Sequence, residues 1–161
     1  MEVSFTHEIP AAREVVIDAY RSVAFYEAKQ RGSGALSVEI LEAGDLPDGR
    51  FRLRARVTEP SRVPAFLRKS ETETYVDESV LDPRAGTLTW KVTPERMADV
   101  FLLSGRVDFA AHGGATRVTY NTTLEVRIPL LGRKAERIGL EKTEAETAAQ
   151  AEFLRSWVAG R

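Results

Sequence analysis

Glu78 is the side chain whose type and position most invite chemistry. It lies in an alternating stretch, residues 73–81, which predicts a β-strand. Pairing Val80 with Leu88 across the following turn sets the register of a hairpin, and Glu78 then faces Trp90 on the apolar side. A carboxyl against an indole loses hydration, which raises its pKa and suits it to acid or base catalysis. The preferred alternative is a solvated position at a cavity mouth, or a pair with an arginine.

The same register assigns other polar residues to one or the other face of the sheet. Asp77 is expected on the outer face opposite Lys91, where the opposite charges of the two side chains would form an exposed cross-strand pair. The alternation of the last two strands turns Tyr120 and Thr122 inward. These two hydroxyls could orient a ligand by hydrogen bonds, or they could bond each other or a trapped water.

The last hairpin contains two further inward positions that bear on a cavity. Pairing across its turn sets Leu103 opposite Leu124 and Gly105 opposite Thr122. Glycine weakens a strand interior unless a bulge or a close approach needs it. Gly105 therefore either makes room in a cavity or marks a simple bulge.

The remaining ionisable side chains argue against metal and nucleic-acid chemistry. His7 is expected to be a hydrogen-bonded sheet residue and His112 an exposed turn residue, and two such histidines do not make a metal site. Arginines alternate with apolar residues along 50–57, where Glu39 is expected opposite Arg54. This pattern favours a salt-bridged outer face over a docking stripe, and no exposed aromatic residues are interleaved there to stack bases.

Composition is that of an ordinary globular domain. The chain has 161 residues, 43% of them hydrophobic and 29% charged, with a net charge of −1 and no cysteine. This length predicts one domain over residues 1–161. The near-zero charge provides no bulk attraction for nucleic acid, and the lack of cysteine excludes disulfides and thiol nucleophiles. The first ten residues do not resemble a signal peptide and no apolar run reaches membrane-spanning length, so a cytoplasmic location is expected.

Periodicity and turn residues predict the order of the elements that position these side chains. Stretches of alternation read as strands, 3.6-residue spacing reads as helix, and Gly, Pro and Asp mark the reversals. The predicted elements are a strand at 2–9, helices at 11–22 and 23–31, strands at 36–43, 50–57, 73–81, 87–92, 100–111 and 116–128, and one long helix after residue 132.

The predicted C-terminal helix has small residues at its middle. Spacing by threes and fours places Ala145, Ala149, Phe153 and Trp157 on one face, together with Ala135 and Ile138. Small residues facing a concave sheet would leave space for a ligand, because a helix that fills a core normally carries Leu or Ile there. Alternatively, alanine is present for its helix propensity and the sheet's side chains fill the gap.

This order of elements resembles the helix-grip fold of the START and birch-pollen-allergen-like (SRPBCC) superfamily, which includes polyketide cyclases. The segments FTHEIPAAREVVIDAYRSVAFYEA and PLLGRKAE are similar to an uncharacterised bacterial branch, in which an Ile-Pro-Leu-x-Gly corner precedes the last helix. The resemblance implies an α+β protein whose curved, seven-stranded antiparallel sheet wraps around a long C-terminal helix. It also implies a hydrophobic internal pocket, but the superfamily hosts carriers, cyclases, sensors and co-chaperones and supplies no substrate.

The leading hypothesis is non-catalytic binding of a hydrophobic or amphipathic small molecule of lipid, polyketide or aromatic type, with no cofactor and no metal. Alternatives are a cyclase-type enzyme that uses Glu78 and Tyr120, and a protein-interaction module. No nucleic acid and no integral membrane segment are expected, and the oligomeric state stays open. The candidate ligand-binding residues are Glu78, Trp90, Leu103, Gly105, Tyr120, Thr122, Ala145, Ala149 and Phe153.

Residues 128–136, IPLLGRKAE, are predicted to form the corner between the last strand and the helix. Pro129 cannot donate to a ladder and ends the strand. Leu130 and Leu131 are expected to tuck under the corner, and Gly132 to supply its unusual backbone dihedrals. The stretch is therefore interpreted as a hinge and not as a linker or a membrane anchor.

Two neighbouring features bear on how a ligand would enter. Arg133 and Lys134 begin the helix, where cations are mildly unfavourable, and this leaves an opening for an anionic ligand group or lipid headgroup. Residues 59–71 are predicted to form a loop or one helical turn at the pocket rim. Entry is expected between the C-terminal helix and the loops at 59–71 and 94–99.

Overall fold

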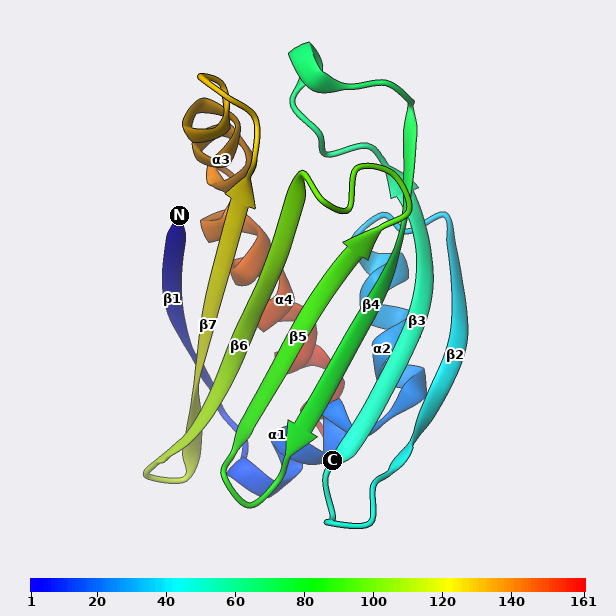
Figure 1. The fold of residues 1–161 in the computed structure, drawn as a ribbon. Coiled ribbons are helices and arrows are strands. Elements are labelled where there is room, and N and C mark those ends of the chain that lie inside the picture. The colour runs from blue at the N-terminus through cyan, green and yellow to red at the C-terminus, as the bar shows by residue number, and fades with distance from the viewer.

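The computed structural model describes residues 1–161 and contains one antiparallel sheet with helices on its concave side (Figure 1). The strands are β1 (Glu2–Ile9), β2 (Ser37–Asp45), β3 (Phe51–Pro60), β4 (Thr72–Asp82), β5 (Thr87–Pro94), β6 (Phe101–His112) and β7 (Ala115–Val126). The helices are α1 (Arg13–Tyr20), α2 (Val23–Gly32), α3 (Gly132–Leu140) and α4 (Thr143–Val158), with a 3-10 turn η1 (Ala65–Leu67).

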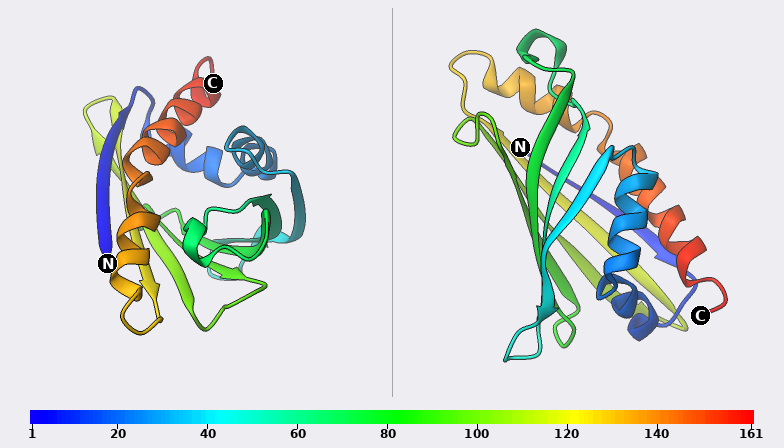
Figure 2. Two further views of the ribbon diagram at one scale, coloured as in Figure 1. Left: turned by 90° about the horizontal axis from the view of Figure 1, so that it is seen from above. Right: turned by 90° about the vertical axis from the view of Figure 1, so that its right-hand side faces the viewer.

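The seven strands are ordered β1-β7-β6-β5-β4-β3-β2, so six sequential strands form a meander and the first strand completes the sheet beside the last. The sheet curves around α4 and the α1–α2 pair, as both views in Figure 2 show. This arrangement confirms the predicted helix-grip architecture. No helix of the chain is both long enough and apolar enough to cross a membrane.

The predicted start of α2 is confirmed by its cap. The Ser22 hydroxyl accepts a hydrogen bond from the Phe25 backbone N–H at 3.2 Å, which satisfies one of the free donors at the helix N-terminus. Phe25 is fully buried, and its ring centroid lies 5.1 Å from that of Tyr20 and 5.4 Å from that of Trp157. This aromatic cluster joins α1, α2 and α4 into one core against the sheet.

The C-terminal helix differs from its prediction in continuity and in its buried face. It is divided into α3 and α4 by residues 141–142, and α4 packs along β1 and α1. Its buried face therefore carries Thr143, Thr147, Ala151, Leu154 and Val158. The predicted face was wrong for Ile138, Ala145 and Ala149, which are exposed. It was right for Ala135, which is buried, and for Phe153 and Trp157, which are half-buried against the core. The small side chains of Ala145 and Ala149 therefore create no space for a ligand, because they point away from the sheet.

The corner after β7 also differs from its prediction. Leu130, not Gly132, adopts the left-handed conformation, with φ of 68°. A Cβ on Gly132 would overlap the Val126 carbonyl oxygen, so glycine is needed there for close approach. The Gly132 N–H donates to Ile128 O at 2.8 Å, which closes a tight turn with Leu130 at its tip. Leu130 and Leu131 therefore project outward and do not tuck under the corner.

The carboxylate of Glu136 ties α3 to the sheet. It accepts hydrogen bonds from the Val126 backbone N–H and from the N-terminal amine of Met1, each at 3.2 Å. The Val126 hydrogen bond is the main reason that the pKa of Glu136 lies below its usual value. The start of β1, the end of β7 and α3 are thus held together at one end of the sheet.

Candidate functional site

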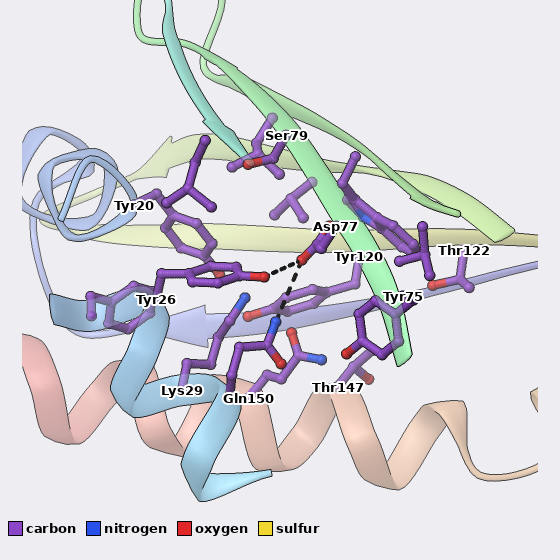
Figure 3. A pocket seen from close by; sticks show the side chains of 17 residues that line it. Tyr20, Tyr26, Lys29, Tyr75, Asp77, Ser79, Tyr120, Thr122, Thr147 and Gln150 are labelled. Carbon is purple, nitrogen blue, oxygen red and sulfur yellow. Dashed lines mark hydrogen bonds between the residues drawn. The ribbon is translucent and has the colours of Figure 1, made fainter. Parts of the chain in front are cut away.

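A cavity of about 180 Å³ lies between the inner face of the sheet and the helices α2 and α4 (Figure 3). Aromatic and aliphatic side chains form most of its wall, and polar side chains from α2, α4 and the sheet are set into it. The lining residues are Tyr20, Phe25, Tyr26, Leu53, Tyr75, Leu88, Trp90, Val92, Val107 and Tyr120, and the polar Lys29, Gln30, Asp77, Ser79, Thr122, Thr147 and Gln150.

The carboxyl in this cavity belongs to Asp77 and not to Glu78. In the hairpin of β4 and β5, Asp77 is paired with Val92, and Glu78 is paired with Lys91. Strand β4 therefore turns Asp77 inward and Glu78 outward, so the predicted faces of both residues were wrong by one position. Glu78 forms ion pairs with Arg52 and, at 3.7 Å, with Arg54 on the outer face. Its proposed catalytic role against the indole is thereby excluded.

Turn chemistry explains the one-residue error in register. The Asp82 carboxylate accepts hydrogen bonds from the backbone N–H groups of Arg84 and Ala85, each at 3.1 Å. Gly86 adopts a positive φ of 68°, and the hairpin closes tightly with Asp82 paired to Thr87. The prediction used a wider turn, which moved every side chain of β4 to the opposite face.

The two valines of β4 reinforced that error. Val76 and Val80 lie on the outer face, where they are paired with Arg56 and Arg52 of β3. Arginine buries its aliphatic stem along apolar surface while its charged end stays in water. Valine is therefore compatible with this half-buried face, and its apolar character does not identify the cavity side.

Asp77 is incompletely satisfied in its buried position. Its Oδ2 accepts hydrogen bonds from the Tyr26 hydroxyl at 2.8 Å and from the Gln30 amide at 3.4 Å. Its Oδ1 is buried and has no hydrogen-bond partner. Burial raises the pKa of Asp77, and the positive charge of Lys29 and the Tyr26 hydrogen bond only partly oppose this effect.

Lys29 brings a cation to the same cavity from α2. Its Nζ lies 5.7 Å from the ring centroid of Tyr20 and 5.6 Å from that of Tyr26, and it makes no ion pair within 4 Å. Figure 3 shows its side chain reaching toward Asp77. Burial lowers the pKa of Lys29, while the Asp77 carboxylate raises it. The cavity thus presents an amine and a carboxyl whose charges are both disfavoured by desolvation.

Trp90, Tyr120 and Thr122 line the cavity, as their predicted inward faces require. The Tyr120 hydroxyl is buried and has no hydrogen-bond partner within 3.5 Å. Burial raises its pKa, and the neighbouring Tyr20 hydroxyl and the positive charge of Arg155 oppose this rise. The predicted register of the last hairpin is confirmed, since Gly105 is paired with Thr122 and Leu103 with Leu124.

Six of the nine predicted ligand-binding residues do not line the cavity. A Cβ on Gly105 would overlap the Trp90 indole, so this glycine makes room for a protein side chain and not for a ligand. Phe153 packs on Phe25, with 5.7 Å between ring centroids, and Thr147 and Gln150 are the α4 residues at the cavity. The six residues outside the lining are Glu78, Leu103, Gly105, Ala145, Ala149 and Phe153.

A chain of polar contacts crosses from β4 to α4 where the entrance was predicted. The Tyr75 hydroxyl donates to Glu59 at 3.2 Å, Glu59 pairs with Arg62 at 3.0 Å, and Arg62 pairs with Glu146 at 2.7 Å. Burial raises the pKa of Glu59, with Arg62 opposing the rise. Loop 61–71 is thereby fastened across this side of the cavity. It is two residues shorter than predicted, since Glu59 and Pro60 end β3, and it contains the helical turn η1.

The remaining ionisable residues bear out the expected outer face. The predicted pairing of Glu39 with Arg54 was wrong by two positions on β3. Arg56 pairs with Glu39 at 3.1 Å and Arg54 lies 3.8 Å from Glu42, because the strands pair up to Asp45 and Phe51 and the register shifts once near Leu41. His7 lies 3.3 Å from the Thr147 hydroxyl, as a hydrogen-bonded sheet residue. No group of three or more His, Asp or Glu side chains is arranged to hold a metal ion.

The sequence contained one signal for the α2 residues that the prediction missed. Tyr26, Lys29 and Gln30 are separated by three and four positions, so they share one helix face. A face that combines Tyr, Lys and Gln gave no reason to expect burial. Asp77, which binds this helix face, was assigned to the outer face of the sheet, so its contact with Tyr26 and Gln30 was not predicted.

Solved structures with the same architecture include proteins with named activities. TTHA0849 from Thermus thermophilus is 18% identical, with a TM-score of 0.71 over 99% of this chain and 97% of that one. The Zhui aromatase/cyclase from Streptomyces sp. R1128 is 16% identical, with a TM-score of 0.72 over 99% and 93%. A START superfamily protein from Mycobacterium smegmatis is 18% identical, with a TM-score of 0.65 over 98% and 97%.

At these identities the likeness establishes the fold and not an activity. No curated protein matches this sequence. A family model described as "Protein of unknown function (DUF2505)" matches residues 4–158, which is nearly the whole chain. The chain therefore belongs to the DUF2505 family, and within it carries the helix-grip fold of the START, birch-pollen-allergen-like and aromatase/cyclase proteins.

Proposed function

We propose that this protein binds an amphipathic small molecule in the cavity between sheet and helices, without transforming it. The observation that carries the proposal is a pair of buried polar atoms without partners, Asp77 Oδ1 and the Tyr120 hydroxyl, in a largely aromatic wall. Each such atom costs about 1–3 kcal/mol when left unsatisfied. A ligand that hydrogen-bonds to both would recover that cost on binding.

The cavity's size and chemistry define the ligand class. An apolar cavity of about 150 Å³ holds a benzene molecule, so about 180 Å³ accommodates one substituted ring or a comparable aliphatic group. Trp90 and Tyr20 offer flat apolar surfaces to such a body. A hydroxyl on the ligand could donate to Asp77 Oδ1 and accept from Lys29 Nζ. A monocyclic phenol or alcohol fits this description better than a purely apolar compound.

Binding can be measured with a matched pair of probes. We expect 4-ethylphenol to bind with saturable quenching of tryptophan fluorescence, and ethylbenzene, which lacks only the hydroxyl, to bind at least tenfold more weakly, about 1.4 kcal/mol. Asp77→Asn and Tyr120→Phe should reduce this preference. Glu78→Gln is the matched control, because its side chain lies on the outer face of the same strand.

Native mass spectrometry of protein purified from its own host provides the second test. Co-purification of a small amphipathic molecule, released by denaturation, is the expected result. Protein that is consistently empty, together with no saturable binding of either probe, would contradict the proposal.

A second candidate function is proton transfer on a bound ligand, since Asp77 and Lys29 bring a carboxyl with a raised pKa and an amine with a lowered pKa to one cavity. These groups take the place of Glu78, which lies on the outer face. Incubation with aromatic ketones in D2O would reveal deuterium at the carbon next to the carbonyl. Exchange that is lost in Asp77→Asn but kept in Glu78→Gln would favour this activity over simple binding.

A further inference from the structure

Exposed apolar side chains gather at one end of the molecule, around α3 and η1. Of seven large hydrophobic residues that are exposed in the chain, four lie in residues 61–71 and 127–138, which we call the rim: Phe66, Leu130, Leu131 and Ile138. Lys134 Nζ lies 5.1 Å from the Phe66 ring centroid, so the two segments are neighbours. Figure 2 shows α3 and η1 at the same end of the sheet.

The rim is also strongly basic in a chain of net charge −1. It contains seven Lys or Arg residues and two Glu residues, and one of these acids, Glu136, is buried in contact with the N-terminal amine. Arg62 and Arg127 are paired with carboxylates, but the other five cations form no ion pair. These unpaired cations are Arg68, Lys69, Arg133, Lys134 and Arg137.

Leu130 is the most exposed apolar residue of the rim, and its backbone conformation directs its side chain into solvent. Leu130 is 102% exposed and adopts φ of 68°, a region that disfavours residues with a Cβ. Glycine would suit this position better, and a polar residue would suit its exposure. Neither local conformation nor core packing explains a leucine there, so we attribute it to contact with something outside the molecule.

We propose that the rim docks peripherally on an anionic lipid bilayer, with Leu130 and Leu131 among the lipid headgroups and the five unpaired cations near the phosphates. Cations around isolated apolar side chains are the usual composition of surfaces that bind at a membrane interface. A protein partner fits less well, because five unpaired cations accompany the apolar side chains, and charged residues are depleted from the core of protein interfaces.

The docked orientation would bring the bilayer to the predicted entrance of the cavity. Loop 61–71 belongs to the rim, and its Arg62 joins Glu59 of β3 to Glu146 of α4 beside the cavity residue Tyr75. An anionic surface would compete with Glu146 for Arg62. The docking proposal does not depend on the cavity being occupied, so it can be tested separately from ligand binding.

Co-sedimentation with vesicles tests the proposal directly. We expect the bound fraction on vesicles of equal phosphatidylcholine and phosphatidylglycerol to exceed that on phosphatidylcholine alone by at least about tenfold, and to fall as salt screens the charges. Leu130→Gly should reduce binding several-fold without loss of thermal stability, because glycine suits the left-handed backbone. Lys134→Glu should also reduce binding.

Matched controls separate a specific rim from general effects. Leu36→Ala removes an exposed leucine outside the rim, and Lys91→Glu reverses an exposed lysine on β5, so both variants should bind like the unmodified protein. Tyr120→Phe, altered only in the cavity, should keep its vesicle binding. Equal binding to both vesicle types, no binding to either, or a dimer in solution that Leu130→Gly dissociates would overturn the proposal.

Discussion

Asp77 and Glu78 are adjacent on β4, yet they lie in opposite electrostatic settings. Glu78 shares the outer face with Arg52 and Arg54, where all three side chains are more than a third exposed. Asp77 faces the cavity, where its Oδ2 is bound by Tyr26 and Gln30 while its Oδ1 has no partner. On the outer face, solvent and opposite charges stabilise the carboxylate of Glu78. On the inner face, one oxygen of Asp77 is buried and has no hydrogen-bond partner.

This difference supports the proposal that the cavity is the functional site. Exposed ion pairs contribute little to stability, typically about 0–1 kcal/mol, and can be exchanged at little cost. A buried carboxyl with an unsatisfied oxygen lowers stability, and such groups occur mostly where a ligand or a reaction uses them. The comparison of the two faces therefore supports the cavity as the site, independently of the likeness to other proteins.

The largest expected change in stability comes from truncating a buried side chain on the inner face of β4. Leu81→Ala removes a side chain that is 1% exposed and should lower the free energy of unfolding by about 2–5 kcal/mol. Val80→Ala, on the half-buried outer face, should cost less than about 1 kcal/mol. Urea unfolding of the two variants measures both values. Equal losses would mean that the two faces are not distinct.

A smaller loss of stability is expected from adding a side chain at Gly105, next to Trp90 of the cavity wall. Gly105→Ala introduces a Cβ that overlaps the Trp90 indole, so it should cost about 1–3 kcal/mol and alter tryptophan fluorescence. Gly114→Ala is the control, because no atom lies within 4 Å of its added Cβ. Thermal unfolding followed by fluorescence distinguishes them. An unchanged spectrum in Gly105→Ala would contradict the position of the indole.

The pH dependence of stability should separate the two carboxyls. Because the folded pKa of Asp77 is raised, the folded chain holds more protons than the unfolded chain between the ordinary Asp pKa of about 3.9 and that raised value. Stability contributed at this site therefore falls as pH rises through that window, and Asp77→Asn should remove the fall.

Unfolding experiments across this pH range provide the measurement. Relative to the unmodified protein, Asp77→Asn should become progressively more stable as pH rises within the window, by less than the packing variants change stability. Glu78→Gln, on the outer face, serves as the comparison variant. A constant difference between Asp77→Asn and the unmodified protein at every pH would show that the buried carboxyl does not titrate differently on folding.

The smallest effect is expected for ion pairs of the outer face. A double-mutant cycle on Arg56 and Glu39, whose charged atoms lie 3.1 Å apart, should give a coupling of about 0.2–1 kcal/mol that decreases in high salt. A coupling of several kcal/mol would show that the outer face is less solvated than the structure indicates.

Local patterns were enough to predict much of the fold. The period of two, with Gly-Gly at the last turn, yields the observed pairing of Gly105 with Thr122, and Ser22 caps α2 as expected. Each of these features depends on a few consecutive residues. The register predicted for the hairpin of β4 and β5 was wrong because the Asp82 carboxylate stabilises a tighter turn. The break between α3 and α4 was not predicted because residues 141–142 include no Gly or Pro.

The sequence by itself determined the meander of strands, the helix pair after β1 and a charged outer face, because strand period, turn residues and charge alternation are local properties. Only the tertiary structure decided that Asp77 and not Glu78 faces the cavity, since a shift of one residue moves a whole strand's side chains to the other face. It also decided that α2 supplies Tyr26 and Lys29 to that carboxyl. Residues about fifty positions apart meet there through packing, which no local pattern encodes.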